Sequence, residues 1–83
     1  MDDRLTLRIL TPEGSAFEGP VDAVFLPGTS APFEVLPGHA PIISSLTAGA
    51  LRWRAAGEET QLDVRAGAVM VKDNVITVCA ERG

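Results

Sequence analysis

Short stretches of the chain alternate apolar and polar residues with a period of two. In residues 5–9 leucine or isoleucine stands at every second position, and residues 21–25, 51–54 and 61–65 repeat the pattern. This alternation is typical of a β-strand with one face buried, because successive side chains of a strand point to opposite faces. The side chains predicted to face inward are Leu5, Leu7, Ile9, Val21, Ala23, Phe25, Leu51, Trp53, Leu62 and Val64.

Two stretches near the end of the chain, Val69–Lys72 and Val75–Ala80, are more continuously apolar, and Asp73 and Asn74 separate them. Asp and Asn tolerate the left-handed conformations of a tight hairpin turn. The pattern therefore predicts a hairpin near the middle of a sheet. The acidic segment Gly57–Glu59 is expected to form the tip of another hairpin.

Helices have little room, because eight Gly and six Pro residues cut the chain into short pieces. We expect an all-β fold, a flattened antiparallel β-sandwich or barrel of about eight to ten short strands. No linker or repeat divides the sequence, so residues 1–83 are expected to form a single domain.

Residues 26–46 differ from the rest, since they hold four of the six prolines and the single histidine. Two Pro-Gly pairs, Pro27-Gly28 and Pro37-Gly38, bracket a minimal strand, Phe33–Leu36. Proline followed by glycine favours a type II turn, so both pairs are predicted to be rigid corners. A rigid corner loses little entropy when a partner binds. A crossover between sheets explains the segment equally well.

Composition excludes several functions. Apolar residues make up 46% of the chain and charged residues 22%, as in folded soluble domains, and the net charge of −4 argues against a general nucleic-acid binder. A single Cys79 and a single His39 exclude an internal disulfide and a zinc site. Cys79, between Val78 and Ala80, is predicted to be buried. No secretory signal or membrane-length apolar run is visible, so we expect a cytosolic location.

Two further features have simple structural explanations. His39 has the chemistry of a general base, but no nucleophile accompanies it in the sequence, so no catalytic residue is expected. Arg52-Trp53-Arg54 superficially resembles a nucleic-acid stripe, yet it fits a strand with Trp53 inward and two solvated arginines. No phosphate-binding glycine loop is present. No cofactor or metal is therefore expected.

Several strings of residues between about Leu5 and Glu81 are specific enough to indicate a family. The most specific is Leu-Pro-Gly-His-Ala-Pro at residues 36–41. The others are Thr11-Pro12-Glu13-Gly14, Phe17-Glu18-Gly19, Val21-Asp22, Leu26-Pro27-Gly28, Val35, Leu46, Gly49, Val71-Lys72-Asp73-Asn74, Thr77-Val78 and Ala80-Glu81. With these strings the chain resembles the N-terminal domain of the epsilon subunit of F-type ATP synthases.

The resemblance implies a non-catalytic rotor subunit that binds the gamma subunit on one side and rests on the membrane c-ring. Ion-driven ring rotation would then reach gamma through it. It would lie peripherally at the cytoplasmic face of the bacterial inner membrane, without inserting, and would use no small-molecule substrate. By position, the loop facing the c-ring is Gly28, Thr29, Ser30, Ala31, Pro32, Phe33 and Glu34, and the gamma-facing residues are Thr11, His39 and Ser44.

The chain departs from the family at two places. Ala31 and Glu34 replace residues that are usually glycine, and Pro32 stiffens the loop further, so the c-ring loop is expected to be less free. Most members continue into two C-terminal helices that inhibit ATP hydrolysis and, in some bacteria, bind ATP. The sequence stops at Gly83, so this helical hairpin is expected to be absent and neither role is assigned to these residues.

Two other functions remain open from the residues alone. One is a freestanding β-sandwich module that binds a small ligand or adds a peptide to a sheet edge. The other is a small hydrolase built on His39, which would lose a turnover activity on substitution of that residue.

Overall fold

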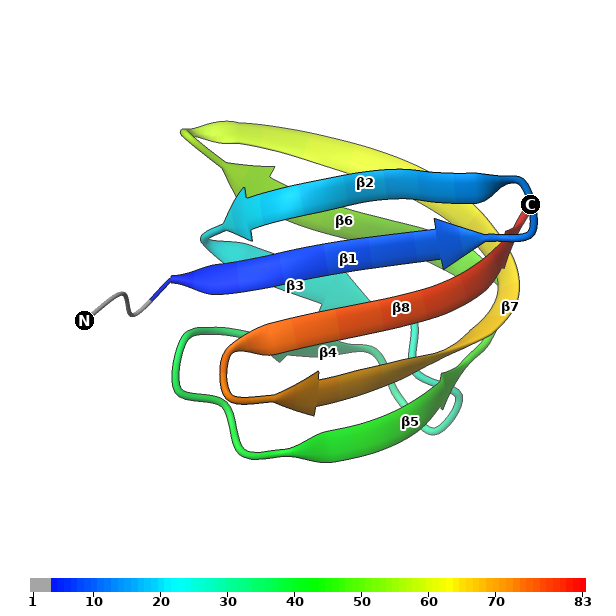
Figure 1. The fold of residues 1–83 in the computed structure, drawn as a ribbon. Coiled ribbons are helices and arrows are strands. Elements are labelled where there is room, and N and C mark those ends of the chain that lie inside the picture. Colours follow the sequence, from blue (N-terminus) through cyan, green and yellow to red (C-terminus); the bar gives the residue numbers. More distant parts are fainter. Residues whose placement is uncertain (1–3) are drawn as a thin grey trace.

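A computed structural model describes residues 4–83, which form eight β-strands (Figure 1). The all-β prediction is confirmed. Within the described residues, no helix is long and apolar enough to cross a membrane. The strands are β1 Leu5–Thr11, β2 Gly14–Val21, β3 Ala23–Leu26, β4 Phe33–Val35, β5 Ile42–Leu46, β6 Gly49–Ala55, β7 Glu58–Lys72 and β8 Val75–Arg82.

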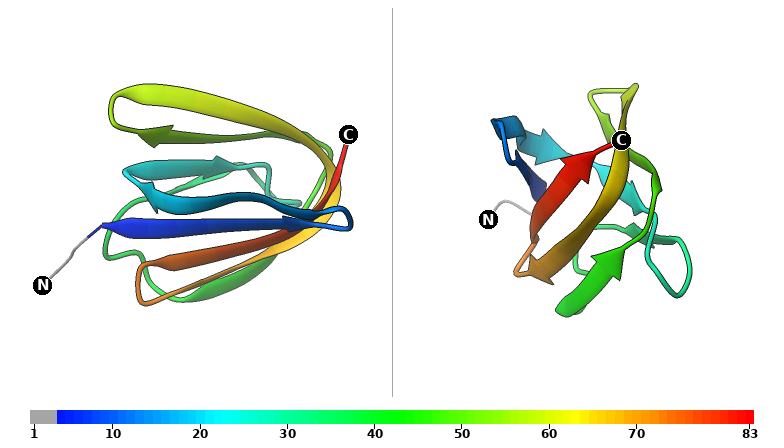
Figure 2. Two further views of the ribbon diagram at one scale, coloured as in Figure 1. Left: turned by 45° about the horizontal axis from the view of Figure 1, so that its top comes forward. Right: turned by 90° about the vertical axis from the view of Figure 1, so that its right-hand side faces the viewer.

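The eight strands form one sheet in the order β2-β1-β8-β7-β6-β3-β4, and β5 pairs with β7 beside this path. The sheet curls over itself, so that its two ends form two layers (Figure 2). The rings of Phe17 on β2 and Trp53 on β6 meet across the layers, 5.0 Å apart. All strand pairs are antiparallel except β1 with β8, which is parallel. The predicted antiparallel sandwich is confirmed apart from this one pair, whose two strands are distant in sequence, so that no hairpin dictates their direction.

Strand β7 is the long, bent strand that connects the two layers. The sequence pattern predicted two short strands in this region, but the structure has one strand of 15 residues. Its first half pairs with β6 and its second half pairs with β5 and β8. The register shifts between Val64 and Ala66, and such a bulge lets a strand bend while its ladder continues. At Gly67, an added Cβ would lie 2.5 Å from the carbonyl oxygen of Cys79, so only glycine fits this bend.

The core fills the space between the layers. Alternation predicted it correctly on β1 and β6, where Leu5, Leu7, Ile9, Leu51 and Trp53 are all buried. No buried residue among the described ones is polar or charged. Burial of each such aliphatic side chain contributes about 1.5–3 kcal/mol, so this apolar core is the main source of stability.

Residues 21–25 do not form the single strand that their pattern predicted. The chain bends at Asp22, whose N–H donates to the carbonyl of Arg54 at 2.7 Å, and this bend separates β2 from β3. After the bend, Val24 is fully buried and Phe25 is only half-buried. The prediction that Phe25 faces inward was wrong: its ring lies on the outer surface, 4.8 Å below the guanidinium of Arg52.

Cys79 is exposed, contrary to the prediction of a buried thiol. Its neighbours Val78 and Ala80 are the buried residues. A strand alternates its faces, so a residue between two buried ones must point outward. The apolar run misled the prediction because the outer face of β8 is itself partly apolar.

Both predicted hairpins exist. Asp73 and Asn74 have φ values of 51° and 62°, as a two-residue turn between β7 and β8 requires. The turn between β6 and β7 is formed by Ala56 and Gly57, with φ values of 52° and 80°. Its tip therefore lies one residue before the predicted acidic one, and Glu58 already belongs to β7.

Candidate functional site

The segment Gly28–Glu34, predicted as one loop, follows β3, and its last two residues, Phe33 and Glu34, already belong to β4. It does not begin with the type II turn predicted at Pro27-Gly28, because Gly28 has no positive φ. The N–H of Gly28 instead donates to the Leu26 carbonyl at 3.0 Å, which makes a tighter turn around Pro27. The glycine is required for space, since an added Cβ would lie 2.5 Å from the Ala31 carbonyl oxygen and 2.9 Å from the Phe33 ring.

The tip of this loop is exposed while its base is fixed to β5. The N–H of Thr29 donates to the carbonyl of Ser45 at 3.1 Å, and their hydroxyl groups are hydrogen-bonded at 2.8 Å. Phe33 packs partly against the core. An open groove of about 740 Å³ lies between this loop and residues 47–50. The loop is therefore an anchored projection with an exposed tip, Thr29 to Pro32.

Replacing Gly28 with alanine is expected to displace this loop, because the new methyl group meets main-chain oxygen and the Phe33 ring. We expect a loss of about 1–3 kcal/mol in the free energy of unfolding, typical of overpacking. Chemical denaturation measures it. The matched control is Gly19→Ala, whose added Cβ would make only ordinary contacts, 3.5 Å from the Phe17 ring. Equal stability of the two variants would contradict the prediction.

The second predicted corner, Pro37-Gly38, is a turn of the expected kind. Gly38 has a φ of 85°, and the N–H of His39 donates to the Leu36 carbonyl at 3.1 Å. Both features define a type II turn with proline and glycine at its centre. The His39 ring is half-buried, and its Nδ1 donates to the carbonyl of Ala40 at 2.7 Å. This bond orients the ring but supplies no nucleophile.

The structure does not bring the three predicted gamma-facing residues together. Thr11 ends β1, and its hydroxyl donates to the Gly14 carbonyl at 2.9 Å. His39 lies near the opposite end of β1. Its neighbour Gly38 donates to the Asn74 side chain, and the Asn74 carbonyl accepts from the N–H of Thr6 at the start of β1. Ser44, on β5, shares the inward side of that strand with the core residue Leu46.

An apolar surface that sequence reasoning missed covers the outside of β1, β5, β7 and β8. Ile43 is 81% exposed and Met70 is 48% exposed, and they are paired across neighbouring strands. A groove of about 370 Å³ runs beside them. We call this surface the apolar outer face; its apolar residues are Leu10, Ile43, Ala68, Met70, Val75 and Cys79, and Arg8, Ser45, Lys72 and Thr77 lie between them. Consecutive apolar residues, as in Ile42-Ile43, were the available signal, since one of the two must face outward.

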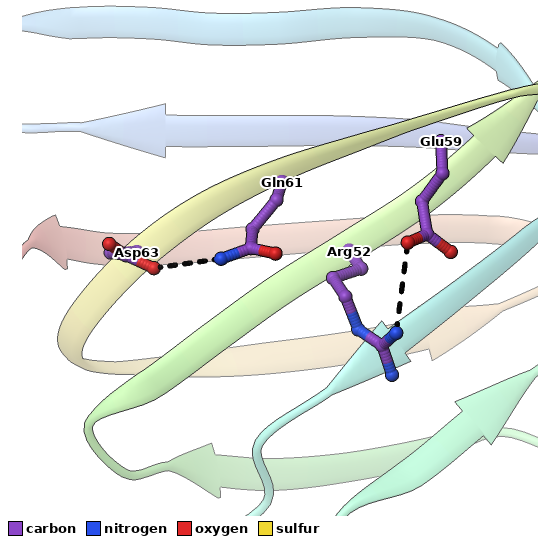
Figure 3. A network of polar contacts seen from close by, with 4 residues as sticks. All are labelled: Arg52, Glu59, Gln61 and Asp63. Atoms are coloured by element: carbon purple, nitrogen blue, oxygen red, sulfur yellow. Dashed lines mark hydrogen bonds and ion pairs between the residues drawn. The ribbon is translucent and has the colours of Figure 1, made fainter.

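The outside of the other layer is polar. Arg52 and Glu59 form an ion pair at 3.7 Å, and Gln61 donates to Asp63 at 3.3 Å (Figure 3). Such exposed contacts contribute little to stability. We call this surface the polar outer face; it comprises Glu34, Arg52, Arg54, Glu59, Gln61 and Asp63. Exposed large apolar side chains such as Ile43 and Met70 thus lie on the first surface, whereas charged side chains predominate on the second.

One further ion pair, Arg65 with Glu81, joins β7 to β8 at 2.8 Å. The hydrogen bond to Glu81, and then the charge of that carboxylate, raise the pKa of Arg65 above its ordinary value. Stabilisation from a raised arginine pKa is complete at every pH below the pKa of the unfolded chain and is lost only at strongly alkaline pH. The raised pKa of Arg65 therefore adds no pH dependence near neutrality. No cluster of three potential metal-ligating side chains occurs in residues 4–83.

The notable features of residues 4–83 are the two anchored segments Gly28–Glu34 and 36–41 and the apolar outer face. The family model for the beta-sandwich domain of the ATP synthase delta/epsilon chain matches residues 4–83. The chain belongs to this family. The resemblance seen in the sequence strings is thereby confirmed.

Curated relatives of this delta/epsilon-chain domain carry the name ATP synthase epsilon chain. That of Synechococcus elongatus is 40% identical over 82 residues, covering 95% of this chain and 60% of the relative. That of Desulfitobacterium hafniense is 36% identical over 81 residues, covering 98% of this chain and 61% of the relative. The chain thus spans about three-fifths of the length of these relatives.

Solved structures support the fold. A chain in the cryo-EM structure of the Euglena gracilis mitochondrial ATP synthase, which contains OSCP, F1 and c-ring, matches with a TM-score of 0.89 at 20% identity. The match covers 96% of this chain and 52% of that one. A chain in the central stalk and c-ring structure of the Tetrahymena thermophila enzyme matches with a TM-score of 0.78 at 18% identity, covering 93% of this chain and 63% of that one.

Proposed function

We propose that the chain is the β-sandwich domain of a non-catalytic rotor subunit of an F-type ATP synthase. It couples the gamma subunit to the membrane c-ring, so that ion-driven rotation supports ATP synthesis. The observation that carries this proposal is the family match over residues 4–83. The names of the epsilon-chain relatives support it.

The gamma subunit is proposed to bind across the apolar outer face. Exposed apolar patches on small domains mark protein interaction sites, and the core of an interface is depleted in charge. Ile43 and Met70 provide the centre of such a patch. Thr11, at the end of β1, and His39, near the start of β1, then lie toward the two ends of the contact with gamma. Ser44 supports this contact surface from the inward side of β5.

The loop Gly28–Glu34 is proposed to contact the polar loops of the c-ring. Its residues Thr29 to Pro32 and Glu34 are exposed, and hydrogen bonds to Ser45 hold its base. A projection that is already ordered loses little entropy on binding. The domain would sit peripherally at the cytoplasmic face of the bacterial inner membrane, without inserting into it.

The test is a calorimetric titration of the domain with purified gamma subunit from the same organism. We expect one-to-one binding. His39→Ala should weaken it about 5–10-fold if the ring forms one interface hydrogen bond. The matched control is Gln61→Ala on the polar outer face, which should bind like the wild type. A folded wild-type domain that does not bind gamma at any salt concentration would overturn the proposed function and leave a freestanding binding module as the alternative.

A further inference from the structure

Asn74, at the tip of the β7–β8 hairpin, joins three segments that are distant in sequence. Its main-chain carbonyl accepts a hydrogen bond from the N–H of Thr6 at 2.8 Å. Its side-chain Oδ1 accepts one from the N–H of Gly38, also at 2.8 Å. A single residue thus ties the hairpin tip to the start of β1 and to the corner that precedes β5.

The corner consists of residues 36–41, which connect β4 to β5 without belonging to either strand. Two of its hydrogen bonds, from the His39 N–H to Leu36 and from the His39 ring to Ala40, stay within the corner. They define its shape but not its place on the domain. The hydrogen bond from the Gly38 N–H to the Asn74 side chain links the corner to the turn between β7 and β8.

The residue type at this position satisfies two separate demands. Asn74 has a φ of 62°, in the left-handed region that Gly, Asn and Asp adopt most readily. The Gly38 N–H also requires a side-chain acceptor at a short reach. Glycine meets the first demand and not the second, whereas Asp meets both. This difference allows the backbone and side-chain roles of Asn74 to be separated by substitution.

We propose that Asn74 is a positioning residue for partner binding: its side chain fixes the corner that presents His39 to the gamma subunit. The inference rests on the proposed function, because it assigns Asn74 a role in the same contact. Asn74 acts through Gly38 and need not touch the partner itself.

The test compares Asn74→Gly with Asn74→Asp in the full chain. In Asn74→Gly, we expect the Gly38 amide to exchange with solvent about 10-fold faster by NMR, and gamma affinity to fall about 5-fold, since one net hydrogen bond is lost. Asn74→Asp should keep both quantities within about 2-fold of the wild type, because an acceptor remains. Thermal unfolding of each variant checks that the domain stays folded at the temperature of the binding measurement.

A double-mutant cycle with His39→Ala separates positioning from general stability. If Asn74 acts through the corner, Asn74→Gly should have a smaller effect on gamma affinity once His39 is already alanine. This inference would be overturned if Asn74→Gly bound gamma as tightly as the wild type, or if the effects of Asn74→Gly and His39→Ala on affinity were fully additive. In both cases, binding of gamma by the wild type would leave the proposed function intact. A wild-type domain that does not bind gamma would overturn both.

Discussion

Replacing Gly67 with valine is expected to destabilise the domain strongly. An added Cβ at Gly67 would lie 2.5 Å from the Cys79 carbonyl oxygen and 2.9 Å from Ala80. These are main-chain atoms of the neighbouring strand and cannot move aside as a flexible side chain does. Valine adds two further carbons, so we expect a cost of at least about 3 kcal/mol. A domain of this length is stable by only about 4–12 kcal/mol in total.

Thermal denaturation followed by circular dichroism measures the effect of Gly67→Val. The expected decrease in Tm is at least about 12 °C, because each kcal/mol shifts a domain of this size by about 4–8 °C. Ala68→Val is the matched control: it adds bulk at the next residue of the same strand, which is exposed. Its stability should remain within about 0.5 kcal/mol of the wild type. A Gly67→Val variant that melts near the wild-type temperature would refute the tight approach of β7 to β8.

Introducing two carboxylates into the apolar outer face, by Ile43→Asp with Met70→Asp, should nearly abolish gamma binding. The two side chains are paired across β5 and β7 at the centre of that face. Central interface residues contribute about 2 kcal/mol or more each, and unpaired charges there must be desolvated. We therefore expect affinity to fall by at least about 100-fold. Calorimetric titration with the gamma subunit measures it.

The domain should still fold with these two substitutions, because Ile43 and Met70 are already 81% and 48% exposed. Gln61→Asp is the control, since it adds one carboxylate to the polar outer face, where binding is not expected. If the folded double variant binds gamma as tightly as the wild type, the gamma site lies elsewhere on the domain.

Much of the strand architecture follows from local sequence. Alternation marked the inward residues of β1 and β6, and the Asp73-Asn74 pair marked the central hairpin. Pro37-Gly38 formed the predicted type II turn, whose torsions proline and glycine favour, whereas Pro27-Gly28 did not, because Gly28 has no positive φ. These features depend on neighbouring residues and on one buried face, so a single sequence is sufficient to predict them.

The sequence strings also determined the family, which the match over residues 4–83 confirmed. The assignment of Thr11, His39 and Ser44 to gamma, and of Gly28–Glu34 to the c-ring, stays a proposal. Position along the chain could not show that Thr11 and His39 lie near opposite ends of β1. The start of β1 and the corner with His39 come together only in the folded sheet, where both are hydrogen-bonded to Asn74.

Only the tertiary structure decided which apolar residues face solvent. The continuity of β7 depends on a bulge and on close packing at Gly67. Gly28 leaves the space that the Ala31 carbonyl and the Phe33 ring occupy. Phe25 and Cys79 lie on outer surfaces because a bend at Asp22 and the alternation of β8 turn them outward. The bend, the bulge and the close packing at the two glycines rest on contacts between segments far apart in sequence. For β8, alternation alone gives two possible faces, and the packing of the layers decides which one is covered.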